Sequence, residues 1–215
     1  MTLMVNEIFY SIQGEASYAG RPCLFVRLTG CNLRCSYCDT RYAYEEGTRM
    51  EIGTILDRLA AYDCPLVEIT GGEPLIQKET PSLVNCLLEK EFQVLMETNG
   101  SQDISQVDSR CIRIVDIKCP LSGEVNKNDL KNLDRLTECD EIKFVISGRE
   151  DYEYAKEILS HVALTLPRMN RIHFSPAFGR MENRELAKWI LDDHLRVRFH
   201  LQVHKIIWKP DLRGL

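Results

Sequence analysis

Three cysteines, Cys31, Cys35 and Cys38, lie within one short segment that reads Cys-Asn-Leu-Arg-Cys-Ser-Tyr-Cys. Thiolates at this spacing can converge on one inorganic centre, and cysteine thiolates are the usual ligands of iron–sulfur clusters. Four protein ligands saturate the irons of a [4Fe–4S] cluster, whereas three leave one iron open to an exogenous chelate, such as the amino and carboxylate groups of a methionine moiety. The spacing therefore predicts a cluster that takes part in chemistry.

Other interpretations of this segment stay open. A structural zinc site needs four ligands, usually in paired Cys or His groups, and no histidine lies nearby in the sequence. A thioredoxin-like pair would use Cys35 and Cys38 and leave Cys31 without a role. Burial of three unrelated cysteines is disfavoured because Asn32 and Arg34 make the segment too polar for a core strand.

The elements that must position these thiols follow from the apolar periodicity of the chain. The strand candidates are residues 24–28, 66–69, 94–96, 112–117, 142–146, 172–174 and 199–207. The helix candidates are residues 51–62, 81–91, 126–136, 150–162 and 183–193. Alternation of strands with helices indicates a parallel sheet and an α/β fold, an abbreviated, partly open (β/α)6-type partial TIM barrel in one domain over residues 1–215. A doubly wound open sheet is the competing architecture.

Polar motifs follow the predicted strands. In parallel α/β folds ligands bind beyond the carboxyl ends of the strands, and the cysteine segment follows the first of them. The later strands are followed by Thr70-Gly-Gly-Glu-Pro74, Glu97-Thr-Asn-Gly100, Lys118-Cys-Pro120 and Ser175-Pro176. We expect these segments to meet at one edge of the sheet and to form the site there.

Composition bounds the class of function. The chain has 215 residues, 44% of them hydrophobic, and a formal net charge of −5, so a basic footprint for direct nucleic-acid binding is not expected. No apolar run is long enough for a membrane span and no export signal is evident, so we expect a cytoplasmic protein with no membrane partner. Without export, cysteines are more often metal ligands or small buried side chains than disulfides. The second interpretation applies to Cys23, Cys64, Cys86, Cys111, Cys119 and Cys139.

Several motifs together resemble a known family. The cysteine triad with Tyr37 before its third member, followed by Gly71-Gly72-Glu73-Pro74, resembles the radical S-adenosylmethionine (SAM) superfamily. The segments Glu7–Glu15, Thr70–Pro74, Glu97–Gly100 and Gln202–Trp208 extend the likeness over nearly the whole chain to the 7-carboxy-7-deazaguanine synthases. The resemblance implies a partial barrel of the radical SAM type. It also implies a carbon–nitrogen lyase of the queuosine and 7-deazapurine pathway, which serves tRNA modification. Such an enzyme converts 6-carboxy-5,6,7,8-tetrahydropterin into 7-carboxy-7-deazaguanine with ring contraction and loss of ammonia.

The resemblance also implies cofactors and residue roles. It assigns the [4Fe–4S] cluster to Cys31, Cys35 and Cys38, and Mg²⁺ to Thr40. The residues implied for SAM are Tyr37, Cys38, Asp39, Gly72, Asp116, Ile117, Lys118, Ser175, Pro176, Ala177 and Phe178. Those implied for the substrate are Ile12, Gln13, Gly14, Arg27, Thr70 and Pro210. These types suit the chemistry, because glycine allows close backbone approach and a guanidinium can grip a carboxylate with two hydrogen bonds.

Partners and competing functions complete the expectations. The resemblance implies an external one-electron donor, flavodoxin or ferredoxin, and a homodimer. A glycyl-radical-enzyme activating enzyme is the alternative, disfavoured by the segment Ser11–Glu15 and the lack of further cysteine pairs. A non-catalytic zinc-binding or tRNA-interacting module is the alternative from another class. His200 and His204 would share one face of the predicted last strand, and we interpret them as structural or substrate-lining residues.

Overall fold

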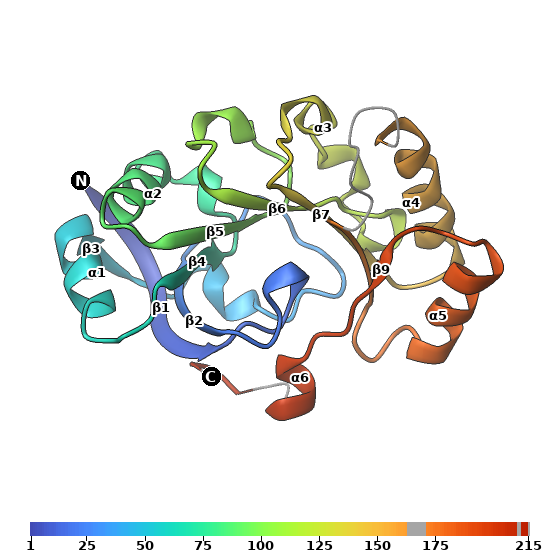
Figure 1. Cartoon of the computed structure of the whole chain (residues 1–215), viewed down its shortest axis with the longest axis horizontal. Coiled ribbons are helices and arrows are strands. Elements are labelled where there is room, and N and C mark those ends of the chain that lie inside the picture. Colours follow the sequence, from blue (N-terminus) through green and yellow to red (C-terminus); the bar gives the residue numbers. More distant parts are fainter. Residues whose placement is uncertain (163–170, 210–211, 215) are drawn as a thin grey trace.

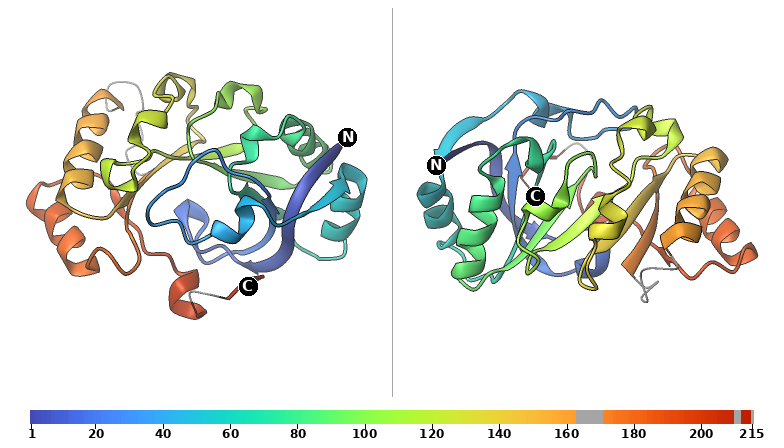
Figure 2. Two further views of the ribbon diagram at one scale, coloured as in Figure 1. Left: turned by 180° about the vertical axis from the view of Figure 1, so that it is seen from behind. Right: turned by 90° about the horizontal axis from the view of Figure 1, so that it is seen from above.

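The computed structural model describes residues 1–162, 171–209 and 212–214. In these ranges the chain forms one sheet of nine strands in the order β3-β1-β2-β4-β5-β6-β7-β8-β9, with helices around its outer side (Figures 1 and 2). The strands are β1 (Thr2–Ile12), β2 (Pro22–Leu28), β3 (Thr48–Glu51), β4 (Leu66–Gly71), β5 (Gln93–Thr98), β6 (Ile112–Asp116), β7 (Glu141–Ile146), β8 (Ile172–Pro176) and β9 (Arg198–Phe199). The helices are α1 (Ile52–Leu59), α2 (Thr80–Glu89), α3 (Asn132–Arg135), α4 (Arg149–Val162), α5 (Asn183–Asp192) and α6 (His204–Ile207).

The strands from β2 through β4 to β9 pair in parallel, and β1 pairs antiparallel with both β2 and β3. The curved sheet does not close, because β3 and β9 form its two edges. The α/β fold and the partly open barrel predicted from the sequence are therefore confirmed. Among the described residues, no helix is both long and apolar enough to cross a membrane.

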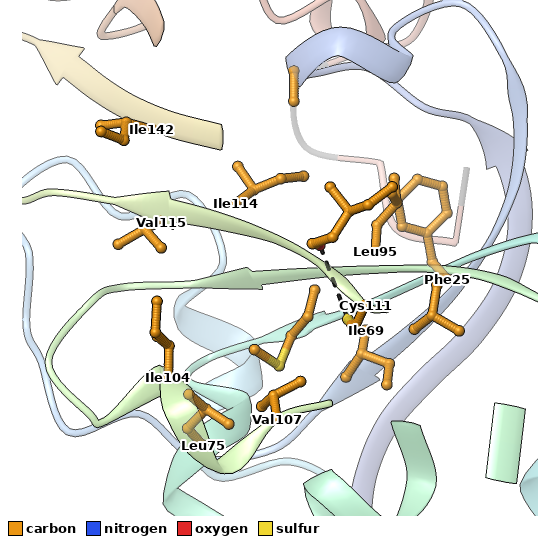
Figure 3. Packing of buried hydrophobic residues seen from close by; sticks show 14 of the residues in the cluster. Phe25, Ile69, Leu75, Leu95, Ile104, Val107, Cys111, Ile114, Val115 and Ile142 are labelled. Carbon is orange, nitrogen blue, oxygen red and sulfur yellow. Dashed lines mark hydrogen bonds between the residues drawn. The ribbon is translucent and has the colours of Figure 1, made fainter. Parts of the chain in front are cut away.

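The central strands are buried on both faces, as expected for a parallel sheet covered by helices. All five residues of β6 are buried, and so are the first five of β4. Figure 3 shows Cys111 with Ile69, Val107 and Ile104 in this core. All nine cysteines lie in the described ranges and are free. Of the six predicted as small buried side chains, Cys86 is half-buried and Cys139 is exposed, so that interpretation is wrong for Cys139.

The predicted strand over residues 199–207 is wrong. Only Arg198–Phe199 pairs with β8, and His204–Ile207 forms the short helix α6. The chain leaves the sheet because this segment bonds elsewhere: the Val203 amide donates to the Gly14 carbonyl at 2.9 Å. His200 and His204 consequently do not share a strand face.

The predicted helix over residues 126–136 is also largely wrong. Its described structure is a 3-10 turn, Val125–Lys127, followed by the single helical turn α3. Asparagine side chains compete with helical hydrogen bonding here. Asn128 accepts from the Lys118 amide at 2.9 Å and donates to the Lys118 carbonyl at 2.8 Å. The side chain of Asn132 bonds in the same way to a neighbouring loop, so both asparagines fix tertiary contacts.

Strands β1 and β3 were not among the predicted ones. Only Leu3 and Val5 are fully buried in β1, and polar residues such as Asn6 and Ser11 interrupt its apolar pattern. No residue of β3 is fully buried, because β3 is an edge strand. Their pairing depends on the partner strand rather than on a local apolar run.

Candidate functional site

A pocket of about 380 Å³ lies at the carboxyl ends of the parallel strands. It is lined by residues from β1, β2, the cysteine segment, β4 to β7 and the segment after β9. Most residues predicted for the site lie in this lining: Ile12, Gln13, Gly14, Arg27, Cys31, Cys35, Tyr37, Cys38, Asp39, Thr40, Thr70, Gly72, Asp116, Lys118, Ala177 and Phe178. Segments far apart in the sequence thus meet at the edge where ligands bind in such folds.

Four predicted residues do not line this pocket. Ile117 and Ser175 are buried in the core, and the Ser175 hydroxyl has no hydrogen-bond partner among the described residues. Pro176 lines a separate cavity, which it shares with Phe178. Pro210 lies outside the described residues.

The cysteine segment is held against the end of β4 by two glycines. A Cβ on Gly72 would lie 2.0 Å from the Gly30 carbonyl oxygen and 2.8 Å from the Cys31 Cβ, so only glycine fits there. Gly71 has φ 147°, a conformation that side chains rarely adopt. The Glu73 amide then donates to the Gly30 carbonyl at 2.7 Å. This close approach fixes the position of Cys31, the residue that follows Gly30.

The three thiols line the same pocket, and two hydrogen-bond donors reach the sulfur of Cys31. The Leu33 amide donates to Cys31 Sγ at 3.4 Å, and Asn99 Nδ2 donates to it at 3.8 Å. Burial raises the pKa of Cys31 and raises that of Cys35 to about 11, while Lys118 acts in the opposite direction. Thiol ligands with amide donors to sulfur suit an iron–sulfur cluster, whose iron stabilises the thiolate form.

The geometry does not favour zinc. Within the ranges that the structure describes, no three His, Cys, Asp or Glu side chains are close enough to hold a single ion. A tetrahedral zinc site brings its ligands within about 2.3 Å of one atom. A [4Fe–4S] cubane instead spreads its cysteine ligands over several irons.

One wall beside the thiols combines an aromatic ring with an ion pair. The Tyr37 ring centroid lies 5.9 Å from Lys118 Nζ, and the buried Tyr37 hydroxyl has no partner among the described residues. Lys118 pairs with Asp116 at 2.8 Å. Burial alone would lower the pKa of Lys118, but Asp116 holds it well above its usual value, so the ammonium group persists. At the rim, Phe178 is 56% exposed. The unpartnered hydroxyl and exposed ring suit a bound nucleoside.

A charged network around Lys143 adjoins this wall through Asp116. Its ammonium group bonds to Glu15 at 2.7 Å and to Glu97, and it lies 3.6 Å from Asp116. Burial alone would raise the pKa of Glu15, but Lys143 holds it well below its usual range. The pKa of Glu97 is raised by burial despite the same lysine. Lys143 therefore serves as a fixed positive charge shared among carboxylates.

Deeper in the pocket, Glu68 projects from β4. It is 3% exposed, and one carboxyl oxygen accepts a hydrogen bond from Gln13 Nε2. Burial, with Glu97 and Glu15 nearby, raises the pKa of Glu68 to about 8. Its carboxyl group is therefore largely protonated at neutral pH.

Arg27 and Thr40 offer polar groups nearer the opening. Arg27 Nε donates to Glu7 at 2.7 Å, and its terminal nitrogens make no hydrogen bond to any described residue. Thr70 is the cross-strand neighbour of Arg27. The Thr40 hydroxyl donates to Asp39 Oδ1 at 2.9 Å, which places two hard oxygen groups side by side. The first pair suits an anionic group and the second suits a cation such as Mg²⁺.

Comparison with known proteins identifies the family. Residues 25–114 match the model of the Radical SAM superfamily. The chain is 47% identical to the 7-carboxy-7-deazaguanine synthase of Chlorobaculum tepidum, with 99% of this chain and 97% of the relative covered. It is 43% identical to the enzyme of the same name from Koribacter versatilis, over 99% of this chain and all of the relative. The chain belongs to the 7-carboxy-7-deazaguanine synthase family.

The fold agrees with this family. The crystal structure of QueE from Escherichia coli superposes with a TM-score of 0.75 over 95% of both chains, at 23% identity. Membership in the radical SAM superfamily implies a [4Fe–4S] cluster and SAM as cofactors. In this structure the three thiols of the cysteine segment line the pocket beside the wall that Tyr37 and Lys118 form.

Several polar residues that line the pocket were not predicted from the sequence. Glu15 and Glu97 stood within motifs that carried the resemblance but received no role. Glu68 and Lys143 stand within apolar strands, Leu-Val-Glu-Ile-Thr and Glu-Ile-Lys-Phe-Val. A charged residue in a buried strand is rare unless it is paired or functional, so this signal could have found both.

A further set of contacts supports the segment after β1, which carries Gln13 to Glu15. The Ala16 amide donates to His200 Nε2 at 3.2 Å, and the Ser17 amide donates to Glu141 Oε2 at 3.0 Å. His173 Nε2 lies 2.7 Å from the same carboxylate oxygen. A Cβ on Gly14 would lie 2.1 Å from His204 Nδ1. The segment is thus fixed from β7, β8 and the chain after β9.

Proposed function

We propose that this chain converts 6-carboxy-5,6,7,8-tetrahydropterin into 7-carboxy-7-deazaguanine with ring contraction and loss of ammonia, in queuosine biosynthesis. The observation that carries the proposal is one pocket in which the three-cysteine segment faces Arg27 and a deep polar end. Similarity to named synthases over 99% of the chain supports the same conclusion.

In this proposal Cys31, Cys35 and Cys38 hold the cluster, and the wall of Tyr37, Asp116 and Lys118 borders SAM. When bound, the cluster and SAM supply the one-electron chemistry that removes a hydrogen atom from C6 of the substrate. The chain contributes positioning and exclusion of water. The Gly71-Gly72 turn keeps its backbone close to the cysteine segment. The ion pair between Lys118 and Asp116 at 2.8 Å gives the wall one positive and one negative group, which neutralise each other.

The substrate carboxylate is assigned to Arg27, whose terminal nitrogens have no acceptor among the described residues. Glu7 holds the guanidinium in place through Nε at 2.7 Å, which lowers the entropy lost on binding. Thr40 would hold Mg²⁺, since Mg²⁺ takes hard oxygens and few protein ligands, and Asp39, which pairs with Lys205, stays among the residues assigned to SAM. Pro210 remains part of this assignment, outside the described residues.

Two partners belong to the proposal. A flavodoxin or ferredoxin is the one-electron donor, and the exposed, basic Arg34, Arg41 and Arg180 around the cysteine segment would suit an acidic protein. A homodimer is supported by exposed apolar side chains, of which Ile206 is 69% exposed.

The test is anaerobic turnover by protein reconstituted with iron and sulfide, in the presence of SAM, Mg²⁺, a reductant and 6-carboxytetrahydropterin. The expected result is 7-carboxy-7-deazaguanine and ammonia in equal amounts, detected by chromatography and mass spectrometry. Cys35→Ala is the matched negative control, because it removes one thiol from the segment. If reconstituted wild type binds iron and SAM and yet forms no product, the assignment is wrong.

A further inference from the structure

Glu68 is a buried carboxyl group for which the protein supplies no positive partner. The nearest lysine of the pocket, Lys143, is taken up by Glu15, Glu97 and Asp116, and no ion pair to Glu68 occurs in the part of the chain that the structure describes. Oε2 of Glu68 accepts from Gln13, and Oε1 has no hydrogen bond to a described residue. A buried acid without a cation is costly, so such a group is expected to meet a ligand that donates hydrogen bonds.

The surroundings of Glu68 favour a flat ligand. Its cross-strand neighbours are Phe25 on β2 and Leu95 on β5, both labelled in Figure 3. The Phe25 ring stacks on Phe9 with centroids 4.8 Å apart and planes 9° apart, and both rings line the pocket. A planar ring system lying against this apolar wall would turn one edge toward the Glu68 carboxyl group.

The distance from Glu68 to the anion-binding group matches a bicyclic ligand. Arg27 follows Phe25 by two residues on β2, as Thr70 follows Glu68 on β4. Two residues of a strand span about 6.6 Å, and the side chains add reach at each end. A 6-carboxypteridine carries its carboxylate at one end and its pyrimidine edge at the other. It can therefore place the carboxylate at Arg27 and the pyrimidine edge at Glu68.

We propose that Glu68 recognises the 2-amino-4-oxopyrimidine edge of the substrate. That edge offers the N3–H and one 2-amino N–H side by side, the same donor pair that a guanidinium presents to a carboxylate. Both can donate to the two oxygens of Glu68, while Gln13 keeps its bond to a second lone pair of Oε2. Glu68 thus selects a 2-amino over a 2-oxo pteridine. This inference rests on the proposed function and deepens it.

Proton release on binding is a consequence. The titratable groups around Glu68 are Glu15, Glu97, Lys143, Cys23 and Cys111. Burial and the two glutamates raise the pKa of Glu68 to about 8, so it is mostly neutral at pH 7 before the ligand arrives. Two converging N–H donors stabilise the ionised form and lower that pKa. Binding at pH 7 therefore releases a proton to the buffer.

The test is a specificity exchange measured by binding rather than turnover. The probes are 6-carboxypterin and 6-carboxylumazine, which differ in having a 2-amino or a 2-oxo group, and their own fluorescence reports binding to reconstituted, SAM-loaded protein. Glu68→Gln replaces one acceptor with a donor, which matches the N3–H and 2-oxo edge of the lumazine and opposes the pterin edge. Wild type should prefer the pterin by about 10- to 100-fold, and Glu68→Gln should lose or reverse this preference.

Glu89→Gln, on the exposed end of α2, is the matched control and should keep the wild-type preference. If Glu68→Gln folds, binds SAM and still prefers the pterin as wild type does, the inference is overturned while the proposed function stands. If wild type binds neither probe and forms no product from 6-carboxytetrahydropterin, the proposed function fails and this inference fails with it.

Discussion

Replacement of His200 by phenylalanine tests how the segment after β1 is held. His200 is 8% exposed, and its Nε2 accepts the Ala16 amide at 3.2 Å. Phenylalanine keeps the ring that meets His173 edge-on at 5.6 Å but removes the acceptor. Ala16 is 1% exposed, so its amide would lose its partner away from water, at a cost of about 1–3 kcal/mol. Ala16 also has φ 60°, a left-handed conformation that this bond helps to maintain.

The expected result has two parts. The free energy of unfolding, measured by denaturant titration under anaerobic conditions, falls by about 1–3 kcal/mol. The KM for the pterin rises more than kcat falls, because the same segment carries Gln13 and Gly14 into the pocket, while SAM binding stays near wild type. His200→Gln should restore both values, since its amide can reach as far as Nε2 and still accept. Equal behaviour of the Phe and Gln variants, or an unchanged KM in both, refutes the reasoning.

The pH dependence of stability gives an independent check on His200. Burial lowers its pKa to about 4 in the folded state, from the ordinary value of 6.5. The unfolded state therefore binds more protons between these values, and the stability due to this group is lost as pH falls from about 6.5 toward 4. His200→Gln should be flatter than wild type in this range. A variant with the same slope as wild type would show that His200 does not titrate as described.

Three further changes have defined outcomes. Gly72→Ala brings a Cβ to 2.0 Å from the Gly30 carbonyl oxygen, so iron and sulfide content after reconstitution should fall well below wild type in folded protein; normal content would contradict the close approach. Arg113→Met leaves the Asp140 carboxylate, 0% exposed, without its cation, so the free energy of unfolding should drop by about 3–5 kcal/mol, and a drop below about 1 kcal/mol would contradict this. Glu68 has a pKa of about 8 in the folded state against an ordinary value of 4.5, so the folded state binds more protons between these values and wild-type stability falls as pH rises from one to the other. Melting temperatures of Glu68→Gln should lack that fall.

The parallel strands were predictable because burial on both faces makes them short apolar runs that need no partner to be seen. The segment 142–146 is such a run and forms β7 almost to the residue. The segment 199–207 is similarly rich in apolar residues, yet most of it does not join the sheet. The Val203 amide donates to the Gly14 carbonyl instead. The local sequence pattern shows which residues are apolar, but it does not show which distant carbonyl will accept a hydrogen bond from a backbone amide.

The same distinction applies to the site. The cysteine segment was predictable because its three thiols are fixed within eight residues of chain. The network around Lys143 was not predictable, because its members come from β7, β5 and the segment after β1. Only the fold brings them together, with Lys143 Nζ at 2.7 Å from Glu15. Lys143 and His173 are cross-strand neighbours, a register that no single segment encodes. Contacts that only the tertiary fold creates cannot be predicted from single segments of the sequence.

The balance of charge in the pocket explains why one acid stands apart. Arg27 is paired with Glu7, Lys118 with Asp116, and Lys143 with Glu15 and Glu97. Each cation is held by a carboxylate before any ligand arrives, so these charges are preorganised and lose little freedom on binding. Among the described carboxyl groups that line the pocket, Glu68 alone accepts a hydrogen bond and has no ion pair. Because every nearby cation is already paired, Glu68 stays neutral until N–H donors from a group that enters the pocket stabilise its ionised form, and that makes it the residue best placed to distinguish one ligand edge from another.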